Sequence, residues 1–360
     1  MKKLVIEVED LKYNINKIKK NTNSKIIAVI KSNGYGLGLI PYSKILIEEE
    51  IKTFGVATVE EAISLRQSNQ EIEIIMLSST ALEDDVKTLI QNNITLTIGS
   101  KEDIKAIENI CQDKIKAHIK IDTGFSRYGF RYDKKEEILE SIKNFNIQIE
   151  GIYSHFSISY YDAKYTKLQY NRFIEVIKYL EENNIELGIK HICNSSAFIQ
   201  YPEMHLDAVR IGSAFLGRLA IENKLSLKKI GKMETNITEI KQIPKGEYIG
   251  YSNSFKTKKD TKVAIIPVGY IDGFNIQTGV DMFRKRDKLR AISSSIKNIF
   301  KKQKLYAKIR GENVEILGKV GTHHIVLDIT DINCKINEIV ELNINPKYVD
   351  SSIRREYLSE

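Results

Sequence analysis

The feature that most constrains the fold of this chain is a series of eight apolar β-type segments within its first 215 residues. Each segment reads as a nearly continuous apolar run, which is typical of strands buried in a parallel sheet beneath covering helices. Most neighbouring segments are separated by helical patterns, such as those at 60–67, 102–111, 135–143 and 164–182. Eight such β/α units predict a closed (β/α)8 barrel of the TIM type rather than an open doubly wound sheet. The segments span residues 26–31, 53–59, 71–77, 94–99, 115–122, 147–156, 189–195 and 206–212.

The sequence changes character after about residue 225. Short strand patterns then follow one another with turns between them and little helix, which predicts a second, mainly antiparallel β domain. A chain of 360 residues suits about two domains. We therefore expect a barrel over residues 1–225 and a β domain over 226–360. The first strand pattern, residues 3–9, has no partner among the eight barrel segments, so the second domain is where it can pack.

The net charge of +8 is concentrated in one segment. Residues 284–304 hold nine Lys and Arg and a single Asp, so the rest of the chain is about neutral. Global basicity is therefore no argument for nucleic-acid binding. Leu289, Ile292, Ile296 and Ile299 fall at helical spacing within this segment. We expect a helix whose apolar stripe packs on the domain, with binding to an anionic lipid or nucleic-acid surface as the alternative.

The remaining bulk properties indicate a cytoplasmic protein. The chain lacks a run of about 18 apolar residues, so we expect no membrane span. The N-terminal region has acidic residues within its first ten and no apolar stretch typical of a secretion signal. Three scattered cysteines, Cys111, Cys193 and Cys334, are compatible with a reducing compartment. Neither they nor the six histidines show metal-ligand spacing, so no metal site is expected.

The chemistry is first indicated by the segment AVIKSNGYGLG, residues 28–38. An apolar run leads directly to Lys31, and Tyr35 follows within a glycine-rich turn. A lysine at the end of a buried strand is costly unless it reacts or is paired, and a lysine amine is the usual anchor of an aldehyde cofactor. Glycines let a backbone approach an anion closely. A solvated lysine followed by a flexible turn is the alternative interpretation.

Further polar residues follow the other predicted barrel strands. In a barrel of this type, function lies at the carboxyl ends of the strands. One such residue alone is more often structural, whereas a coherent set from four or more strands rarely arises by accident. Besides Lys31 and Tyr35, the set contains Lys120, Asp122, Arg127, His155, Asn194, Ser195, Arg210 and Gly212.

Six segments together resemble the alanine racemase family, the fold-type III enzymes that use pyridoxal 5′-phosphate (PLP). The resemblance runs from about Val5 to Gly273 and continues more weakly to the end. It rests on AVIKSNGYGLG, on KIDTGFSRYGF with Lys120 and Arg127 seven residues apart, and on GIYSHF around His155. It also rests on CNSSAF followed by LDAVRIG, with Ser195 and Arg210 fifteen residues apart, and on PVGYIDGF with Tyr270.

The resemblance implies roles for individual residues. Lys31 would hold PLP and act as the base on one face of the substrate α-carbon, with Tyr270 from the other subunit of a head-to-tail homodimer on the opposite face. Arg210 would face the pyridine nitrogen, where the related decarboxylases carry a carboxylate instead. Arg127 and Thr322 would contact the substrate. Lys120 would be carbamylated and hold Arg127, or else point to Asp122. The further cofactor-binding residues implied are Tyr35, His155, Asn194, Ser195, Gly212 and Ser213.

Four departures from the family pattern leave the substrate open. Leu37 replaces a histidine, Tyr160 replaces an aspartate with Asp162 nearby, and residues 321–323 replace a Cys-Met-Asp run. A late phosphate-binding tyrosine is missing, and Ser351 is the nearest candidate. We expect racemisation of L-alanine to D-alanine for cell-wall supply. The alternatives are a racemase for serine or another amino acid, a decarboxylase of the same fold type, and a protein that binds PLP without turnover.

Overall fold

The computed structural model describes residues 2–276, 288–289, 292–293, 296 and 304–359. Most of the basic segment 284–304 lies outside the described residues, and with it the helix expected there. The chain forms two compact units, one of residues 8–230 and one that combines the first seven residues with 231–359.

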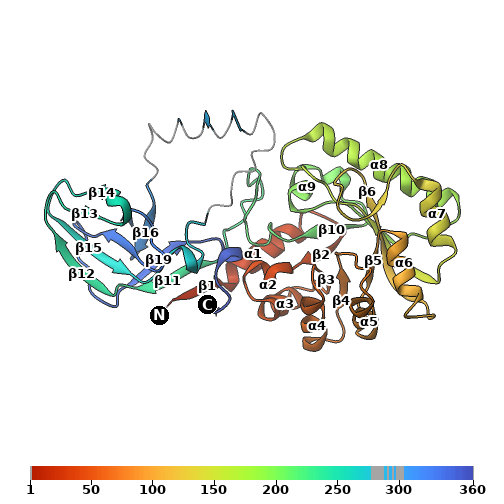
Figure 1. Cartoon of the computed structure of the whole chain (residues 1–360), viewed down its shortest axis with the longest axis horizontal. Helices are drawn as coiled ribbons and strands as arrows, with labels where there is room; N and C mark the ends of the chain where they lie inside the picture. Colours follow the sequence, from red (N-terminus) through yellow and green to blue (C-terminus); the bar gives the residue numbers. More distant parts are fainter. Residues whose placement is uncertain (1, 277–287, 290–291, 294–295, 297–303, 360) are drawn as a thin grey trace. The chain divides into compact units, whose positions relative to one another are not determined.

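The first unit is a parallel barrel of eight strands (Figure 1). Neighbouring strands follow the order β4-β3-β2-β10-β9-β8-β6-β5, and a parallel bridge between Ile75 and Thr95 joins its two ends. All eight expected segments form these strands, so the predicted (β/α)8 fold is confirmed. A short strand, β7 (Phe130–Arg131), pairs with β6 outside this order. The barrel strands are β2 (Lys25–Val29), β3 (Thr53–Val56), β4 (Glu73–Met76), β5 (Leu96–Ile98), β6 (Ile115–Asp122), β8 (Ile147–Tyr153), β9 (Ile189–His191) and β10 (Ala208–Ile211).

Helices surround these strands, as Figure 1 shows for α3 to α8. Four of them begin at a side-chain N-cap, supplied by Thr58, Ser100, Asp162 and Asn194. In the longest, α8, buried residues recur every three or four positions from Thr166 to Leu180, so one face packs on the barrel. The right-handed helices are α1 (Val8–Lys19), α3 (Leu39–Glu48), α4 (Val59–Ser68), α5 (Glu83–Gln91), α6 (Lys101–Glu108), α7 (Lys135–Lys143), α8 (Ala163–Glu182) and α9 (Ser195–Gln200). The segment labelled α2 (Lys31–Tyr35) in Figure 1 contains left-handed backbone angles.

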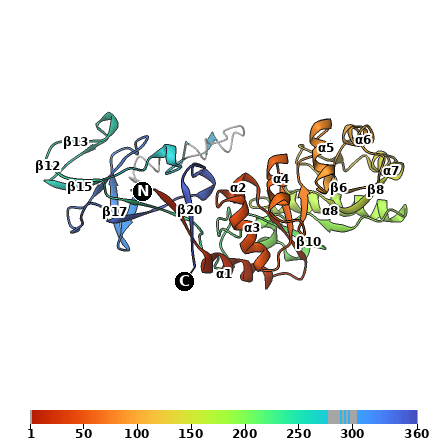
Figure 2. The same ribbon diagram turned by 90° about the horizontal axis from the view of Figure 1, so that it is seen from below.

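The second unit is built on a nine-stranded sheet in the order β12-β15-β18-β17-β16-β19-β11-β1-β20. Every pairing is antiparallel except that of β1 (Lys3–Glu7) with β20 (Arg354–Leu358), which lie beside each other in Figure 2. The first strand of the chain thus belongs to this sheet. A hairpin of β13 (Tyr248–Ile249) and β14 (Phe255–Lys256) stands apart from it. The remaining strands are β11 (Lys232–Asn236), β12 (Glu239–Ile243), β15 (Thr261–Ile266), β16 (Tyr306–Ile309), β17 (Glu312–Leu317), β18 (Ile325–Asp328) and β19 (Ile339–Asn343).

A membrane span is not found among the helices of the described residues, since none is long and apolar enough to cross a bilayer.

Candidate active site

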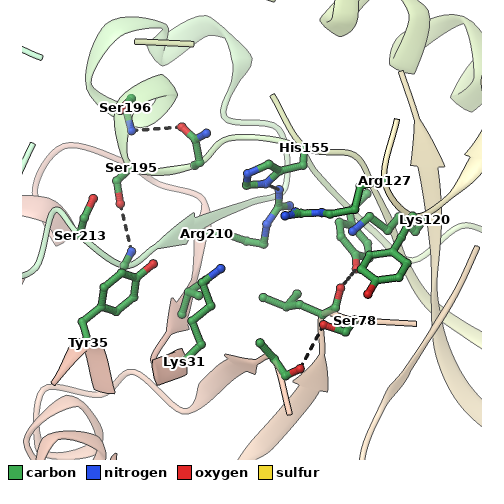
Figure 3. Close-up of a pocket in the computed structure, with 17 residues that line it drawn as sticks. Lys31, Tyr35, Ser78, Lys120, Arg127, His155, Ser195, Ser196, Arg210 and Ser213 are labelled. Atoms are coloured by element: carbon green, nitrogen blue, oxygen red, sulfur yellow. Dashed lines mark hydrogen bonds between the residues drawn. The ribbon is translucent and has the colours of Figure 1, made fainter. Parts of the chain in front are cut away.

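A cavity of about 470 Å³ opens at the carboxyl ends of the barrel strands (Figure 3). Tyr35, Ser195 and Ser213 lie at one end of it and Lys120 and Arg127 at the other, with the Lys31 and Arg210 side chains between them. Ten of the residues expected at the site line this cavity: Lys31, Tyr35, Lys120, Arg127, His155, Asn194, Ser195, Arg210, Gly212 and Ser213. Sequence reasoning did not single out further lining residues, which include Ser78, Tyr128, Tyr153 and Ser196.

A left-handed turn follows Lys31 directly. The backbone of Ser32, Asn33, Gly34 and Tyr35 has φ angles of 57°, 53°, 63° and 54°, so four successive residues adopt the αL conformation. For a residue with a Cβ this costs about 1–2 kcal/mol. Hydrogen bonds offset that strain: the Asn33 side-chain oxygen accepts from the Leu39 amide at 2.8 Å, and the Asn33 amide donates to a carboxylate oxygen of Glu61 at 3.1 Å. The expected glycine-rich loop is therefore a specific, strained turn.

This turn brings the Tyr35 ring against Gly212. A Cβ atom at Gly212 would lie 2.6 Å from the Tyr35 phenol oxygen and 2.8 Å from two ring carbons, so only glycine fits there without displacement. Burial raises the pKa of Tyr35 to about 12, so its phenol remains a hydrogen-bond donor at neutral pH.

Ser195 completes this end of the cavity. Its hydroxyl oxygen accepts from the amides of Gly212 at 3.0 Å and Ala214 at 3.2 Å. A serine oxygen has two lone pairs, so the hydroxyl hydrogen of Ser195 is left to donate to a ligand. The backbone amide of Gly212, one of the expected cofactor-binding residues, donates to Ser195, and the missing side chain of Gly212 makes room for the Tyr35 ring. The Asn194 side chain caps α9 by accepting from the amides of Ser196 and Ala197.

Arg210 is fixed at the centre of the cavity by hydrogen bonds in several directions. Its Nη2 donates to the carbonyl oxygens of Ser154 at 2.6 Å and Ile192 at 3.1 Å, and its Nη1 to the carbonyl oxygen of His191 at 3.2 Å. Burial lowers the pKa of Arg210 to about 10, which still leaves the guanidinium charged at neutral pH. A permanent cation is thus held in one orientation.

A chain of histidines continues from Arg210 into the barrel. Arg210 Nη1 donates to His191 Nδ1 at 2.6 Å, and His191 Nε2 lies 2.9 Å from His118 Nδ1. Because a guanidinium only donates, His191 must accept at Nδ1 and therefore donate from Nε2 to His118. Burial and the charge of Arg210 hold the pKa of His191 well below its usual range and lower that of His118 to about 3, so both rings are neutral.

His155 is oriented by the same cation. Arg210 Nη2 donates to His155 Nδ1 at 3.3 Å, which places the ring hydrogen of His155 on Nε2. Burial and the charge of Arg210 hold its pKa well below the usual value. Sequence reasoning missed His118, Tyr153 and His191. His118 and Tyr153 could have been found from the alternation of side chains along a strand. His118 lies two residues from Lys120 and Tyr153 two residues from His155, so each is expected on the same face as a site residue.

Lys120 lies among cations at the other end of the cavity. Burial, Arg210 and Arg127 lower its pKa to about 7, so a large fraction of its amine is neutral at physiological pH. Its Nζ atom is 5.0 Å from the centre of the Tyr153 ring and 5.4 Å from that of Tyr128. The Lys120 amine has no carboxylate partner within ion-pair distance in the part of the chain that the structure describes.

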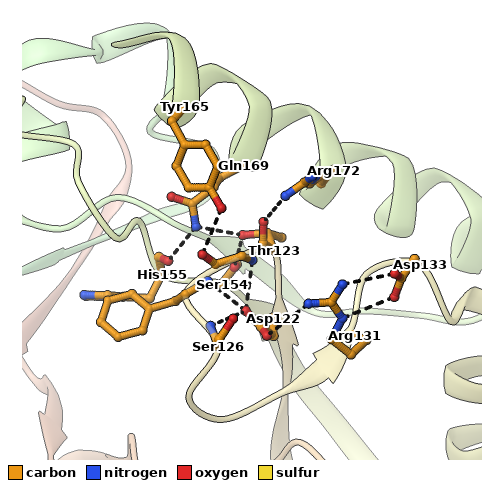
Figure 4. Close-up of polar contacts among 12 residues, drawn as sticks. Asp122, Thr123, Ser126, Arg131, Asp133, Ser154, His155, Tyr165, Gln169 and Arg172 are labelled. Carbon is orange, nitrogen blue, oxygen red and sulfur yellow. Dashed lines mark hydrogen bonds and ion pairs between the residues drawn. The ribbon is translucent and has the colours of Figure 1, made fainter. Parts of the chain in front are cut away.

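Asp122, the alternative partner of Lys120, is used to shape the loop that carries Arg127 (Figure 4). Its Oδ1 atom accepts from the amides of Gly124, Phe125 and Ser126 at 2.9–3.0 Å. Helix α8 holds the loop from outside, since Tyr165 donates to the Gly124 carbonyl oxygen and Arg172 donates to that of Thr123. The interpretation that Lys120 points to Asp122 is therefore not supported. Within the loop, the Arg127 guanidinium lies over the Phe125 ring at 4.4 Å.

Tyr270 and Thr322 belong to the second unit and are not among the residues that line the barrel cavity. The structure brings these two residues together, because the Thr322 hydroxyl donates to the Tyr270 phenol oxygen at 2.9 Å. The side chain of Tyr270 is half exposed.

Comparison with known proteins places this chain among characterised sequences. Residues 6–219 match the family model "Alanine racemase, N-terminal domain" and residues 230–354 match "Alanine racemase, C-terminal domain". The chain belongs to the alanine racemase family. It is 33% identical over 348 residues to an alanine racemase of Methanococcus maripaludis, covering 93% of this chain and 87% of the relative. It is 40% identical over 281 residues to an alanine racemase of Clostridium tetani, covering 75% and 72%.

Solved structures agree with this assignment. The alanine racemase of Clostridium difficile superposes with a TM-score of 0.85 at 27% identity, covering 99% of this chain and 95% of that one. The enzyme of Streptomyces lavendulae superposes at 0.84 and 20% identity, covering 100% and 97%, which supports the fold alone. The chain is accordingly an enzyme of the racemase class. Its cavity lies in the part that matches the alanine racemase N-terminal domain, and Tyr270 lies in the part that matches the C-terminal domain.

Proposed function

We propose that this protein interconverts L-alanine and D-alanine with PLP as cofactor and so supplies D-alanine for the cell wall. The observation that carries the proposal is the meeting of Lys31, Arg210 and Arg127 with the hydroxyl groups of Tyr35 and Ser195 in one cavity. Relatives that cover most of the chain bear the name alanine racemase. The family resemblance and this arrangement support the same chemistry.

The residues present fit PLP. One end of the cavity offers a phosphate the protonated phenol of Tyr35 and the unused hydroxyl hydrogen of Ser195, with Ser213 beside them. These are neutral donors, which suit an anion through hydrogen bonds rather than charge. The cavity centre offers the fixed guanidinium of Arg210 to the pyridine nitrogen, and Lys31 offers its amine to the aldehyde. When bound, PLP supplies an electron-withdrawing ring that stabilises negative charge at the α-carbon of an attached amino acid.

Arg210 favours racemisation over decarboxylation. It remains a cation and only donates hydrogen bonds, so it would keep the pyridine nitrogen of bound PLP unprotonated. Arg210 would thus leave the cofactor a weaker electron sink, which favours quick return of a proton to the α-carbon. His191 and His155 both accept from Arg210, and this fixes the plane of the guanidinium.

Racemisation requires a proton donor on each face of the α-carbon. Lys31 serves one face, and the Tyr270 phenol of a second subunit serves the other, so the working form is a homodimer with shared sites. The side chain of Tyr270 is half exposed in its own chain, which leaves it accessible to a second subunit and supports this assignment. We place the enzyme in the cytoplasm, where its three cysteines, all unpaired in the structure, remain reduced.

Arg127 binds the substrate carboxylate, and Lys120 holds Arg127 as a carbamate. A carbamate forms when the neutral amine adds to CO2 and loses a proton, and the pKa of about 7 at Lys120 makes that amine available. The product is an anion. The positive charges of Arg127 and Arg210, which lower the pKa of the Lys120 amine, would stabilise this anion. Carbamylation thus removes the repulsion between these cations.

The test is incubation of the purified protein with PLP and L-alanine, followed by chiral chromatography. The expected result is an equal mixture of the two enantiomers, and none from Lys31→Ala. L-serine and basic amino acids run in parallel test the substrate. Turnover of serine but not of alanine would show that serine is the substrate. Release of CO2 would show that the protein is a decarboxylase. Bound PLP without any product would show that the protein binds the cofactor without turnover.

A further inference from the structure

The turn that carries Tyr270 is fixed at its backbone. The Tyr270 amide donates to the Gly321 carbonyl oxygen at 3.0 Å and the Ile271 amide to that of Thr322 at 3.3 Å. The Gly269 amide donates to the buried carboxylate of Asp272 at 2.9 Å. A Cβ atom at Gly269 would lie 2.1 Å from the Thr322 carbonyl oxygen, so the two segments touch at their backbones. The strand connection containing Thr322 and the turn containing Tyr270 therefore form one unit.

The side chain of Tyr270 lacks comparable support from packing. It is 51% exposed within its own chain, so the apolar groups of that chain do not hold its ring as they hold a buried ring. Its phenol oxygen instead receives a hydrogen bond from the Thr322 hydroxyl at 2.9 Å, which is within the usual range for two hydroxyl groups. Because both backbones are fixed to each other, this bond selects one orientation of the ring.

We propose that Thr322 is a positioning residue that holds the Tyr270 phenol ready for proton transfer. The inference rests on the proposed racemase function and assigns Thr322 an action through Tyr270 in place of direct substrate contact. Thr322 occupies one lone pair of the phenol oxygen, so the phenol hydrogen is left to point toward the substrate. When that hydrogen has been transferred, the bond from Thr322 becomes charge-assisted and stronger, which favours the deprotonated phenol.

Two variants separate the hydroxyl from the shape of the side chain. Thr322→Val keeps the shape and removes the donor, whereas Thr322→Ser keeps the donor. Loss of one hydrogen bond of this kind predicts a fall in kcat/KM of about fivefold for Thr322→Val. Thr322→Ser should remain within about twofold of the parent, since it retains the bond.

Kinetic isotope effects on kcat/KM, measured with α-deuterated L-alanine and D-alanine, give a readout that a structural defect does not move. Slower transfer at Tyr270 makes that step more rate-limiting. Thr322→Val should therefore raise the isotope effect for the enantiomer that gives its proton to Tyr270 and lower it for the other, which gives its proton to Lys31. Equal changes for both enantiomers, or no change, would overturn the inference.

A measurement without turnover distinguishes this inference from the proposed function. In protein labelled with ¹³C at the tyrosine ζ position, the resonance absent from Tyr270→Phe identifies Tyr270. Thr322→Val should shift that resonance, and Thr322→Ser should leave it in place. An unchanged resonance in Thr322→Val contradicts the hydrogen bond even if the enzyme racemises alanine, whereas a shifted resonance in a protein without racemase activity contradicts the proposed function alone.

Discussion

Substitution of Gly212 by alanine should weaken PLP binding through Tyr35. A Cβ atom there would lie 2.6 Å from the Tyr35 phenol oxygen, and an ordinary contact begins at 3.4 Å, so the ring must retreat by roughly 0.8 Å. Such a displacement breaks a hydrogen bond from the phenol to a phosphate. A bond to a charged group contributes about 1.5–3 kcal/mol, which corresponds to a rise in Kd of about 10- to 150-fold.

The assay is a titration of the cofactor-free protein with PLP, followed by the visible absorbance of the bound form. Gly212 does not have a positive φ angle, so the backbone accepts alanine and the fold should survive. Tyr35→Phe is the matched variant, because it removes the hydroxyl and leaves Gly212 intact. The double variant should bind PLP more tightly than the sum of the two single effects predicts, since both act on one hydrogen bond. A Kd for Gly212→Ala equal to that of the parent would refute the reasoning.

Three further predictions concern the other end of the cavity and its centre. Incubation with ¹³CO2 should give a ¹³C NMR signal of a carbamate at Lys120 that grows as the pH rises through about 7, because the neutral amine is the reactive form. Lys120→Arg should lose this signal, and Lys116→Arg should keep it. Asp122→Ala should raise KM about tenfold with a smaller effect on kcat, since three hydrogen bonds from backbone amides that shape the Arg127 loop are lost. Asp133→Ala, which breaks only an exposed ion pair, should change neither KM nor kcat. Arg210→Gln should lower the free energy of unfolding in urea by about 3 kcal/mol because buried carbonyl groups lose their donor, and an unchanged value would contradict the hydrogen bonds described.

The barrel could be predicted from the sequence because its signal is repeated eight times. Strands covered on both faces are largely apolar, so several of them contain a nearly continuous apolar run, such as the four residues that end β2. The final strand of the chain, β20, was not predicted. Its five residues begin Arg354–Arg355 and its burial is only partial, so it pairs at a sheet edge without an apolar pattern.

The conformation after Lys31 could not be predicted in the same way. Glycines at 34, 36 and 38 indicate a turn, but Ser32, Asn33 and Tyr35 carry Cβ atoms and still adopt left-handed conformations. The bonds that Asn33 makes with Leu39 and Glu61 help to offset that strain, and Glu61 lies 28 residues away in sequence. Tertiary contacts, not local preference, decide the conformation there.

The polar residues behind the cavity show a second limit. Arg210 could be singled out from its motif, but its partner His191 and the next residue in the chain of hydrogen bonds, His118, come from different strands. Each alone resembles an ordinary core histidine. Their common role depends on Arg210, which can only donate hydrogen bonds and so determines which ring nitrogens of the histidines accept. The sequence does not show this role, because it requires knowing that the strands are neighbours.

The central claim is that Lys31 and Tyr270 exchange the α-proton of alanine at a PLP site built on this cavity. Its most direct test is proton NMR of L-alanine incubated with the PLP-loaded enzyme in D2O. The account predicts that the α-proton signal disappears while the methyl group remains, and that D-alanine accumulates to an equal share with deuterium at its α-carbon. An α-proton signal that persists unchanged in the presence of bound PLP would contradict the account.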